Sequence, residues 1–228
     1  MRWTRRSGWL AVWMAAWAWG AVGTPAFGQS IKEQLTALTE GLNDPDPIIR
    51  LATYEEAVGS DSATLRRVAL RTALQSDDAD LRSLALRGAL KGRELIAFKL
   101  FPTAEHAAAL AAAKDDAALK EVQEWYKAND RLLWSYGEVL TVRIASYDYG
   151  TGAVDGFCMT GSASPQKAWN ASGTVAGDEL TLTTRCAVPG PRECTLVAEL
   201  DKAGKLQGSL RCAGGTGVGQ ARAELDLL

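Results

Sequence analysis

The chain has 228 residues, of which 47% are hydrophobic and 23% are charged, and its formal net charge at pH 7 is −2. This composition is typical of a globular protein. Without its first 28 residues the chain has 22 basic and 27 acidic residues, a net charge of about −5. This net charge argues against a nucleic-acid partner, because a basic face supplies most non-specific affinity for nucleic acid, and we expect no such partner.

Residues 1–28 have the pattern of an export signal. Three arginines within the first six residues precede an uncharged stretch rich in Trp and Ala, and Ala26-Phe27-Gly28 places small residues where a signal peptidase reads them. We predict cleavage before Gln29 and a periplasmic or secreted mature protein. The apolar run is shorter than the roughly 20 residues of a spanning helix, so we expect no membrane span after cleavage. The Arg5-Arg6 pair leaves the twin-arginine export route open beside ordinary secretion.

Three consecutive sixteen-residue blocks, 44–59, 60–75 and 76–91, align without gaps. Their shared apolar columns follow one stripe of an α-helix. An Asp or Ser that can cap a helix stands before each stripe, at Asp46, Ser62 and Asp78. Because one short amphipathic helix cannot bury its stripe alone, we predict that the three helices stack side by side.

The first block resembles a known family of helical repeats. The segment Leu42-Asn43-Asp44-Pro45-Asp46-Pro47-Ile48-Ile49-Arg50-Leu51-Ala52 resembles the opening of a HEAT-type repeat, with its Asp, Pro, Ile and Arg in order. The resemblance covers about residues 35–92. It implies a ladder of Asp and Arg side chains between neighbouring repeats, and it assigns this structural role to Asp44, Arg50, Asp78 and Arg82.

The prediction for the first half is a HEAT-like helical repeat domain over residues 29–134. We expect a capping helix over 31–42 at one end, and helices over 94–134, broken at Pro102, at the other. His106 is the only histidine of the chain and lies in an Ala-rich stretch, which predicts an exposed or partly packed helix residue. Trp125 and Tyr126 are predicted to pack against the repeats or the β half.

After Trp134 the sequence alternates in the period of two that is typical of half-buried strands. We set a boundary near residues 135–138 and predict a separate antiparallel β domain over 138–228, with a two-residue turn at Gly177-Asp178. The expected architecture is therefore α+β in two domains, with a small antiparallel barrel or sandwich. Seven strands are predicted: 139–145, 154–160, 171–176, 180–187, 193–200, 206–212 and 220–227.

The four cysteines all lie in the β half. An even number in an exported chain predicts two disulfides, and the close C-x2-C pairs typical of zinc sites are missing from the sequence. Hairpins centred on Gly190 and Ala203 place three of the cysteines abreast on adjacent strands. Two connectivities stay open, 186–194 with 158–212 or 158–186 with 194–212; the first is slightly favoured because its loop is short. The four residues are Cys158, Cys186, Cys194 and Cys212.

The sequence shows no combination of nucleophile, base and metal ligands, so we predict no catalytic residues, no metal site and no cofactor. The leading hypothesis is an exported, non-catalytic protein-interaction or scaffold protein of the bacterial envelope, whose partner is another envelope protein. One alternative is a carrier that holds a small apolar ligand inside a β-barrel. Another is an enzyme with a carboxylate-based site around Tyr147, Asp148, Tyr149 and Asp155.

Overall fold

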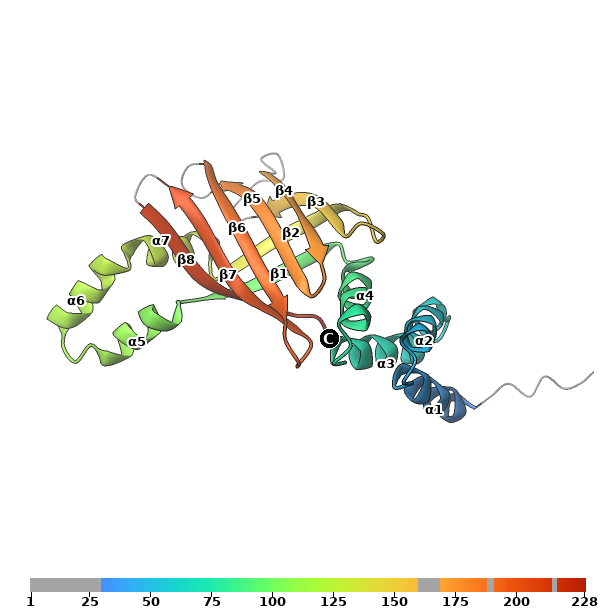
Figure 1. Cartoon of the computed structure of the whole chain (residues 1–228). Coiled ribbons are helices and arrows are strands. Elements are labelled where there is room, and N and C mark those ends of the chain that lie inside the picture. Colours follow the sequence, from blue (N-terminus) through green and yellow to red (C-terminus); the bar gives the residue numbers. More distant parts are fainter. Residues whose placement is uncertain (1–29, 160–168, 188–190, 215–216) are drawn as a thin grey trace, which may run out of the picture.

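The computed structural model describes residues 30–159, 169–187, 191–214 and 217–228, so the predicted export signal lies outside the described residues. Four helices precede an eight-stranded antiparallel barrel, and three further helices are inserted after its first strand (Figure 1). An α+β chain with an antiparallel barrel is thereby confirmed. None of the helices in the described ranges combines the length and the apolar character that crossing a membrane requires.

We name the first four helices the helical array; α1 is the predicted helix over 31–42, and α2, α3 and α4 follow the three predicted blocks. Their bounds are α1 (Ile31–Leu42), α2 (Pro47–Gly59), α3 (Ala63–Leu74) and α4 (Ala79–Leu90). The predicted N-caps are confirmed: Asp46 accepts from the N–H of Ile48, Ser62 from that of Leu65, and Asp78 from those of Asp80 and Leu81.

Small residues let the helices of the array approach one another. Ala57, Ala73 and Ala89 recur every sixteen residues, and all three are buried. Gly88 serves the same purpose in α4, because a Cβ there would lie 2.3 Å from the Tyr54 hydroxyl of α2. Because these small residues recur at the same position of each block, the helices of the array can pack closely against one another.

The barrel closes with its strands in chain order, and each strand is hydrogen-bonded on both sides. The hairpin turn at Gly177-Asp178 is confirmed by the pairing of Ala176 with Glu179. The strands are β1 (Leu95–Phe101), β2 (Val139–Tyr147), β3 (Ala153–Met159), β4 (Trp169–Ala176), β5 (Glu179–Ala187), β6 (Pro191–Leu200), β7 (Lys205–Gly214) and β8 (Gly217–Asp226).

Strand β1 corrects the prediction of a helix that starts at residue 94. In Leu95–Phe101 the side chains alternate between exposed and buried, with Ile96, Phe98 and Leu100 inside. This strand pairs with both β2 and β8 and closes the barrel, so the barrel contains a strand from before the predicted boundary at 135–138. The alternation of apolar residues over 95–101 is short, and Ala- and Leu-rich helical segments precede and follow it, so the sequence pattern predicted a helix for this segment.

The remaining helices are α5 (Ala104–Ala112), α6 (Asp116–Trp125) and α7 (Lys127–Tyr136), all between β1 and β2. Helix α7 lies on β8 and buries Leu132 and Tyr136. Gly219 of β8 makes this approach possible, because a Cβ at that position would lie 2.7 Å from the carbonyl oxygen of Ala128. The N–H of Gln220 donates to the Asn129 side chain at 2.8 Å, which fixes α7 to the strand.

One of the two predicted hairpin registers is confirmed and the other is wrong. Cys194 pairs with Cys212 on β6 and β7 as predicted. On β5 and β6, however, Cys186 pairs with Arg192 and Thr184 with Cys194, a shift of two residues from the prediction. A shift of two keeps every side chain on its face, so the apolar pattern could not distinguish the two registers.

The disulfides follow from this register. Cys158 is bonded to Cys186, and Cys194 to Cys212. The favoured connectivity, 186–194 with 158–212, is therefore wrong, and the other open alternative is the observed one. Two disulfides suit a protein of an oxidising compartment.

The inside of the barrel is occupied by protein side chains. The inward leucines are fully or almost fully buried, and all four cysteines lie inside with them. The Tyr136 hydroxyl of α7 lies 3.2 Å from Cys194 Sγ. The inward leucines include Leu140, Leu180, Leu182, Leu196, Leu206 and Leu210.

Candidate functional site

Helices α5 and α6 project away from the barrel, on the side opposite the helical array (Figure 1). We name residues 104–125 the helical arm. Both helices are described in full, yet α6 has no buried side chain and α5 buries only His106. Most stability of short helices in proteins comes from tertiary packing of an apolar face. The arm therefore presents helical surface that the rest of the fold leaves uncovered.

His106 holds the arm to the first turn of α7. Its ring is fully buried and stacks on the Tyr126 ring with a centroid distance of 4.3 Å. Its Nε2 atom lies 3.4 Å from Asp130 Oδ1. The prediction that His106 is exposed or only partly packed is wrong, because the small alanines around it let Tyr126 cover the imidazole.

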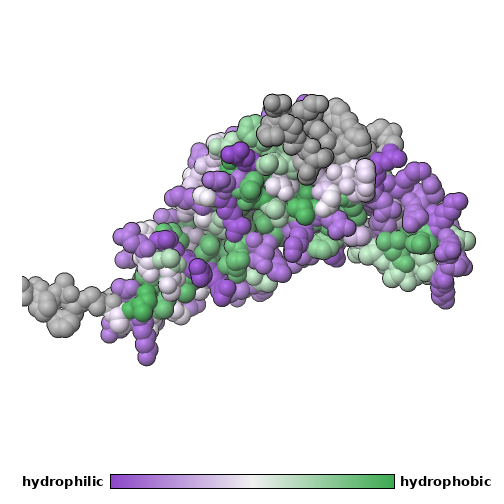
Figure 2. Space-filling view, turned by 180° about the vertical axis from the view of Figure 1, so that it is seen from behind, coloured by the Kyte–Doolittle hydropathy of each residue, from purple (hydrophilic) through white to green (hydrophobic). Residues whose placement is uncertain are grey.

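Large apolar side chains of the arm and of α7, to which the arm is attached, face solvent. Trp125 is 81% exposed and Trp134 of α7 is 79% exposed, and Leu119 also lies at the surface. The expectation that Trp125 packs against the repeats or the β half is therefore wrong. Figure 2 shows hydrophobic residues gathered on one side of the arm next to a hydrophilic side.

The charges of the arm are mainly acidic. Its 22 residues contain five acidic and two basic side chains, and Glu121 and Glu124 are exposed close to Trp125 in the chain. Glu124 forms an exposed ion pair with Lys127 at 3.0 Å. The arm thus combines an exposed indole with a predominantly negative surround.

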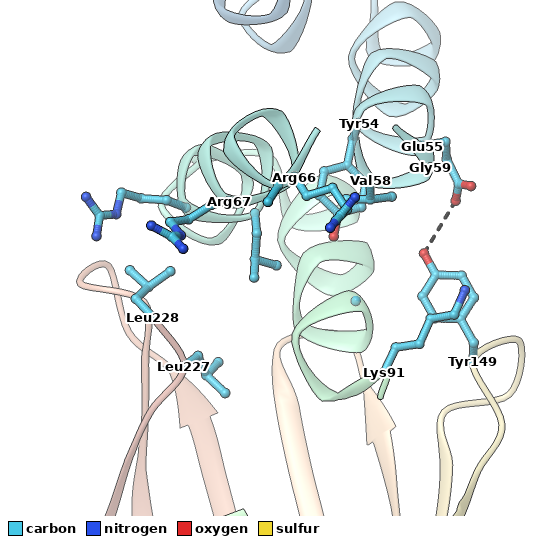
Figure 3. Close-up of a pocket in the computed structure, with 14 residues that line it drawn as sticks. Tyr54, Glu55, Val58, Gly59, Arg66, Arg67, Lys91, Tyr149, Leu227 and Leu228 are labelled. Carbon is cyan, nitrogen blue, oxygen red and sulfur yellow. Dashed lines mark hydrogen bonds between the residues drawn. The ribbon is translucent and has the colours of Figure 1, made fainter. Parts of the chain in front are cut away.

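A second surface lies where the array meets the barrel. A cavity of about 700 Å³, which we name the junction cleft, is bounded by α2, α3, α4, the loop after β2 and the C-terminal segment (Figure 3). Its charged lining residues are Arg66, Arg67, Arg71 and Lys91, together with Glu55. The Tyr149 hydroxyl donates to Glu55 at 3.4 Å across one end of the cleft.

The array and the barrel are tied together around this cleft. Arg82 of α4 forms an ion pair with Asp178 in the turn between β4 and β5. Arg87 donates to the Gly150 carbonyl and Arg93 to the Leu227 carbonyl, each at 2.7 Å. These contacts fix the walls of the cleft from both sides.

The residues assigned to a repeat ladder have separate roles. Arg50 donates through Nε to the Asp78 carboxylate at 2.7 Å, and it also donates to the backbone carbonyl of Asp44. The Asp44 carboxylate instead accepts from the N–H of Asp46. Arg82 reaches the barrel at Asp178, as described above. The Arg50–Asp78 pair therefore joins α2 to the N-terminus of α4.

The environment of Asp78 favours its charged form. Burial raises the pKa of this carboxyl, but hydrogen bonds from the Leu81 N–H and from Arg50, together with the Arg50 charge, outweigh burial. The net result is a pKa of Asp78 below its ordinary value.

The residues of the suggested carboxylate-based site have different surroundings. Asp148 accepts from the N–H groups of Gly150 and Thr151 in its own loop, and these bonds lower its pKa. Asp155 is exposed on β3. Tyr147 and Tyr149 instead turn toward the array, where burial raises the pKa of each to about 12.

Among the described residues, His, Cys, Asp and Glu form no group of three or more that could hold a metal ion.

Comparison with known proteins gives no relative. No protein-family profile, no curated protein and no solved structure matches the chain.

Sequence reasoning missed both surfaces. A signal for the arm was present, since α5 consists largely of alanine and has few large side chains with which α6 could pack. A signal for the cleft was the spacing of Arg67 and Arg71, which places both cations on one side of α3 next to Leu70. Neither pattern identifies what lies opposite in space.

Proposed function

We propose that this is an exported, non-catalytic interaction protein of the bacterial envelope, periplasmic or secreted, which binds another envelope protein through the helical arm. The observation that carries the proposal is the exposure of Trp125 on a helix that buries no side chain. Exposed apolar patches mark interaction sites, and Trp is enriched among the residues that dominate binding energy.

The chemistry of the arm specifies the kind of partner. Trp125 and Leu119 supply exposed apolar surface on α6, while Glu121, one turn before Trp125, and Glu124 supply negative charge near the indole. The complementary surface is an apolar groove with a basic rim, which receives an amphipathic helix by its apolar face.

In this proposal the other parts of the chain are supports. The disulfide-linked barrel forms one domain and holds α7, and α7 holds the arm. The helical array forms a second domain of HEAT-like repeats, in which the Arg50–Asp78 pair acts as the ladder between repeats. The regular stacking of α2, α3 and α4 supports this interpretation.

The carrier alternative receives less support. A ligand inside the barrel would have to replace the buried leucines and the four cysteines that occupy its interior. The enzyme alternative also receives less support, because the Asp148 carboxylate accepts hydrogen bonds within its own loop.

The proposal is tested by photo-cross-linking in intact cells. A photoreactive amino acid at Gln123, beside Trp125 in the chain, should give a discrete cross-linked protein, and Trp125→Ala in the same chain should abolish it. The matched position is Arg211, which is exposed on β7. Equal cross-linking from Gln123 and Arg211, or adducts that survive Trp125→Ala, would contradict the proposal.

The partner found in this way provides the quantitative test. Trp125→Ala should weaken its affinity for the purified protein by tenfold or more, on the order of the 1.4 kcal/mol or more lost when a central Trp is truncated. Val218→Ala, at an exposed apolar position of the barrel, should leave the affinity unchanged.

A further inference from the structure

We propose that the junction cleft binds an anionic amphiphile, a small molecule with a negatively charged head group and an apolar chain. This site is independent of the interaction at the helical arm, which lies on the opposite side of the barrel (Figure 1).

The size and the apolar part of the lining suit a small molecule. The cavity of about 700 Å³ lies within the range of ligand pockets, roughly 300–1,000 Å³. Its apolar side chains come from three separate parts of the chain, with Val58 on α2, Leu70 on α3 and Leu227 at the C-terminal segment. These groups can bury a hydrocarbon chain on several sides.

The charged part of the lining suits an anion. Four cationic side chains line the cleft, and among the described residues Arg67, Arg71 and Lys91 belong to no ion pair. Glu55, the only acidic side chain of the lining, accepts a hydrogen bond from Tyr149. The side chains that line the cleft therefore carry more positive than negative charge.

Tyr54 provides an independent indication of a ligand. Its side chain lines the cleft and is fully buried, yet its hydroxyl has no hydrogen-bond partner in the described structure. Burial raises the pKa of this hydroxyl, so it stays protonated and able to donate at physiological pH. A buried donor without a partner is costly, and a ligand that accepts its hydrogen bond removes that cost.

Both parts of the lining are needed to identify the class of ligand. Inorganic anions would use the arginines but would leave Val58, Leu70 and Leu227 without a partner. A neutral hydrocarbon would use these residues but would leave the cations unpaired. An amphiphile with a carboxylate, sulfonate or phosphate head satisfies both groups at once.

The test is the equilibrium binding of dodecanoate to the purified mature protein, measured by isothermal titration calorimetry. Dodecanol, which lacks the charge, and inorganic phosphate, which lacks the chain, should each bind at least about tenfold more weakly than dodecanoate. We expect that, of the three probes, dodecanoate is the one that binds saturably. Equal binding of dodecanoate and dodecanol, or no saturable binding of any of the three probes, would overturn the proposal.

Two variants localise the binding to the cleft. Arg66→Glu/Arg67→Glu should weaken dodecanoate by about tenfold or more, since both charges are reversed beside the head group. Arg143→Glu/Arg211→Glu makes the same change of charge on the barrel surface and should not alter the affinity. Unchanged affinity in the cleft variant, with a thermal melt equal to that of the native protein, would assign any binding to another site.

Tyr54→Phe tests the buried hydroxyl without a change of charge or shape. It should weaken dodecanoate binding several-fold and at the same time raise the melting temperature of the ligand-free protein, because a buried donor without a partner is removed. A lower melting temperature together with unchanged affinity would contradict the role given to this hydroxyl.

Vesicles of phosphatidylglycerol distinguish the source of the amphiphile. Transfer of a labelled lipid from vesicles to the protein would identify a bilayer lipid as the ligand, whereas binding of dodecanoate without such transfer would identify a free fatty acid or a similar molecule. Both results support the proposal. Because the arm is not involved, Trp125→Ala should leave dodecanoate binding intact even if the proposed protein partner is not found.

Discussion

The β-barrel and the helical arm use similar residue types in opposite ways. In the barrel, Leu182 and Leu196 face each other on adjacent strands and are fully buried. In the arm, Leu119 and Trp125 lie on a helix that buries no side chain. The barrel thus provides the stability, and the arm provides apolar surface to solvent.

This difference indicates which region of the chain is available for binding. Apolar side chains inside a closed, cross-linked barrel are explained by folding alone. An exposed Trp on a projecting helix contributes little to folding in the monomer, so binding is the better explanation for it.

The disulfides should give the largest effect. Replacement of Cys194 and Cys212 by Ala, or of Cys158 and Cys186, should each lower the free energy of unfolding by about 2–4 kcal/mol, because each bond restricts the unfolded chain. Urea unfolding followed by far-UV circular dichroism measures the change. Losses under about 1 kcal/mol for both pairs would show that strand pairing alone stabilises the barrel.

Leucine-to-alanine changes compare the two regions directly. Leu196→Ala should cost about 2–5 kcal/mol because it leaves a cavity in the barrel. Leu119→Ala should cost clearly less, about 1 kcal/mol, because the Leu119 side chain is 36% exposed and its removal leaves no closed cavity. Urea unfolding of the two variants checks this, and similar costs would mean that the arm is part of the cooperative core.

The Arg50–Asp78 pair should give a moderate, pH-dependent effect. Asp78→Asn keeps an N-cap residue but removes the charge, and should cost about 1 kcal/mol at pH 7. The pKa of Asp78 is lower in the folded protein than its ordinary 3.8, so the contribution is present above that value and is lost as the pH falls through the folded pKa.

The neighbouring aspartate provides the control for that measurement. Asp77 forms a highly exposed pair with Lys202, so Asp77→Asn should have almost no effect between pH 7 and pH 3. Unfolding curves at several pH values measure both variants. A stability difference between native protein and Asp78→Asn that is the same at pH 7 and pH 3 would contradict the charge-based explanation.

Tyrosine ionisation at the array–barrel junction should give the smallest effect. The pKa of Tyr147 and of Tyr149 is about 12 in the folded protein against an ordinary 10.0, so the unfolded chain loses these protons first. Their contribution is complete below pH 10 and declines as the pH rises from 10 to 12, by about 1 kcal/mol or less per tyrosine at pH 10.5. Tyr147→Phe should reduce this alkaline loss, and an unchanged pH dependence would contradict the assignment.

Local patterns in the sequence determined the individual elements. Asp46, Ser62 and Asp78 start helices because their side chains accept from N–H groups two or three residues away. The alternation from Leu206 to Cys212 and the short turn before it determined the register of β6 with β7. An even number of cysteines was sufficient to predict two disulfides, although not their partners.

Only the tertiary structure decided how these elements combine. The barrel closes because β1 pairs with β8, more than one hundred residues further along the chain, and no local period encodes such a contact. The partner of Cys186 depended on a two-residue choice of register that leaves every side chain on the same face. The exposure of Trp125 and the hydrogen bond from Tyr149 to Glu55 likewise depend on what lies opposite in space, which periodicity and capping cannot specify.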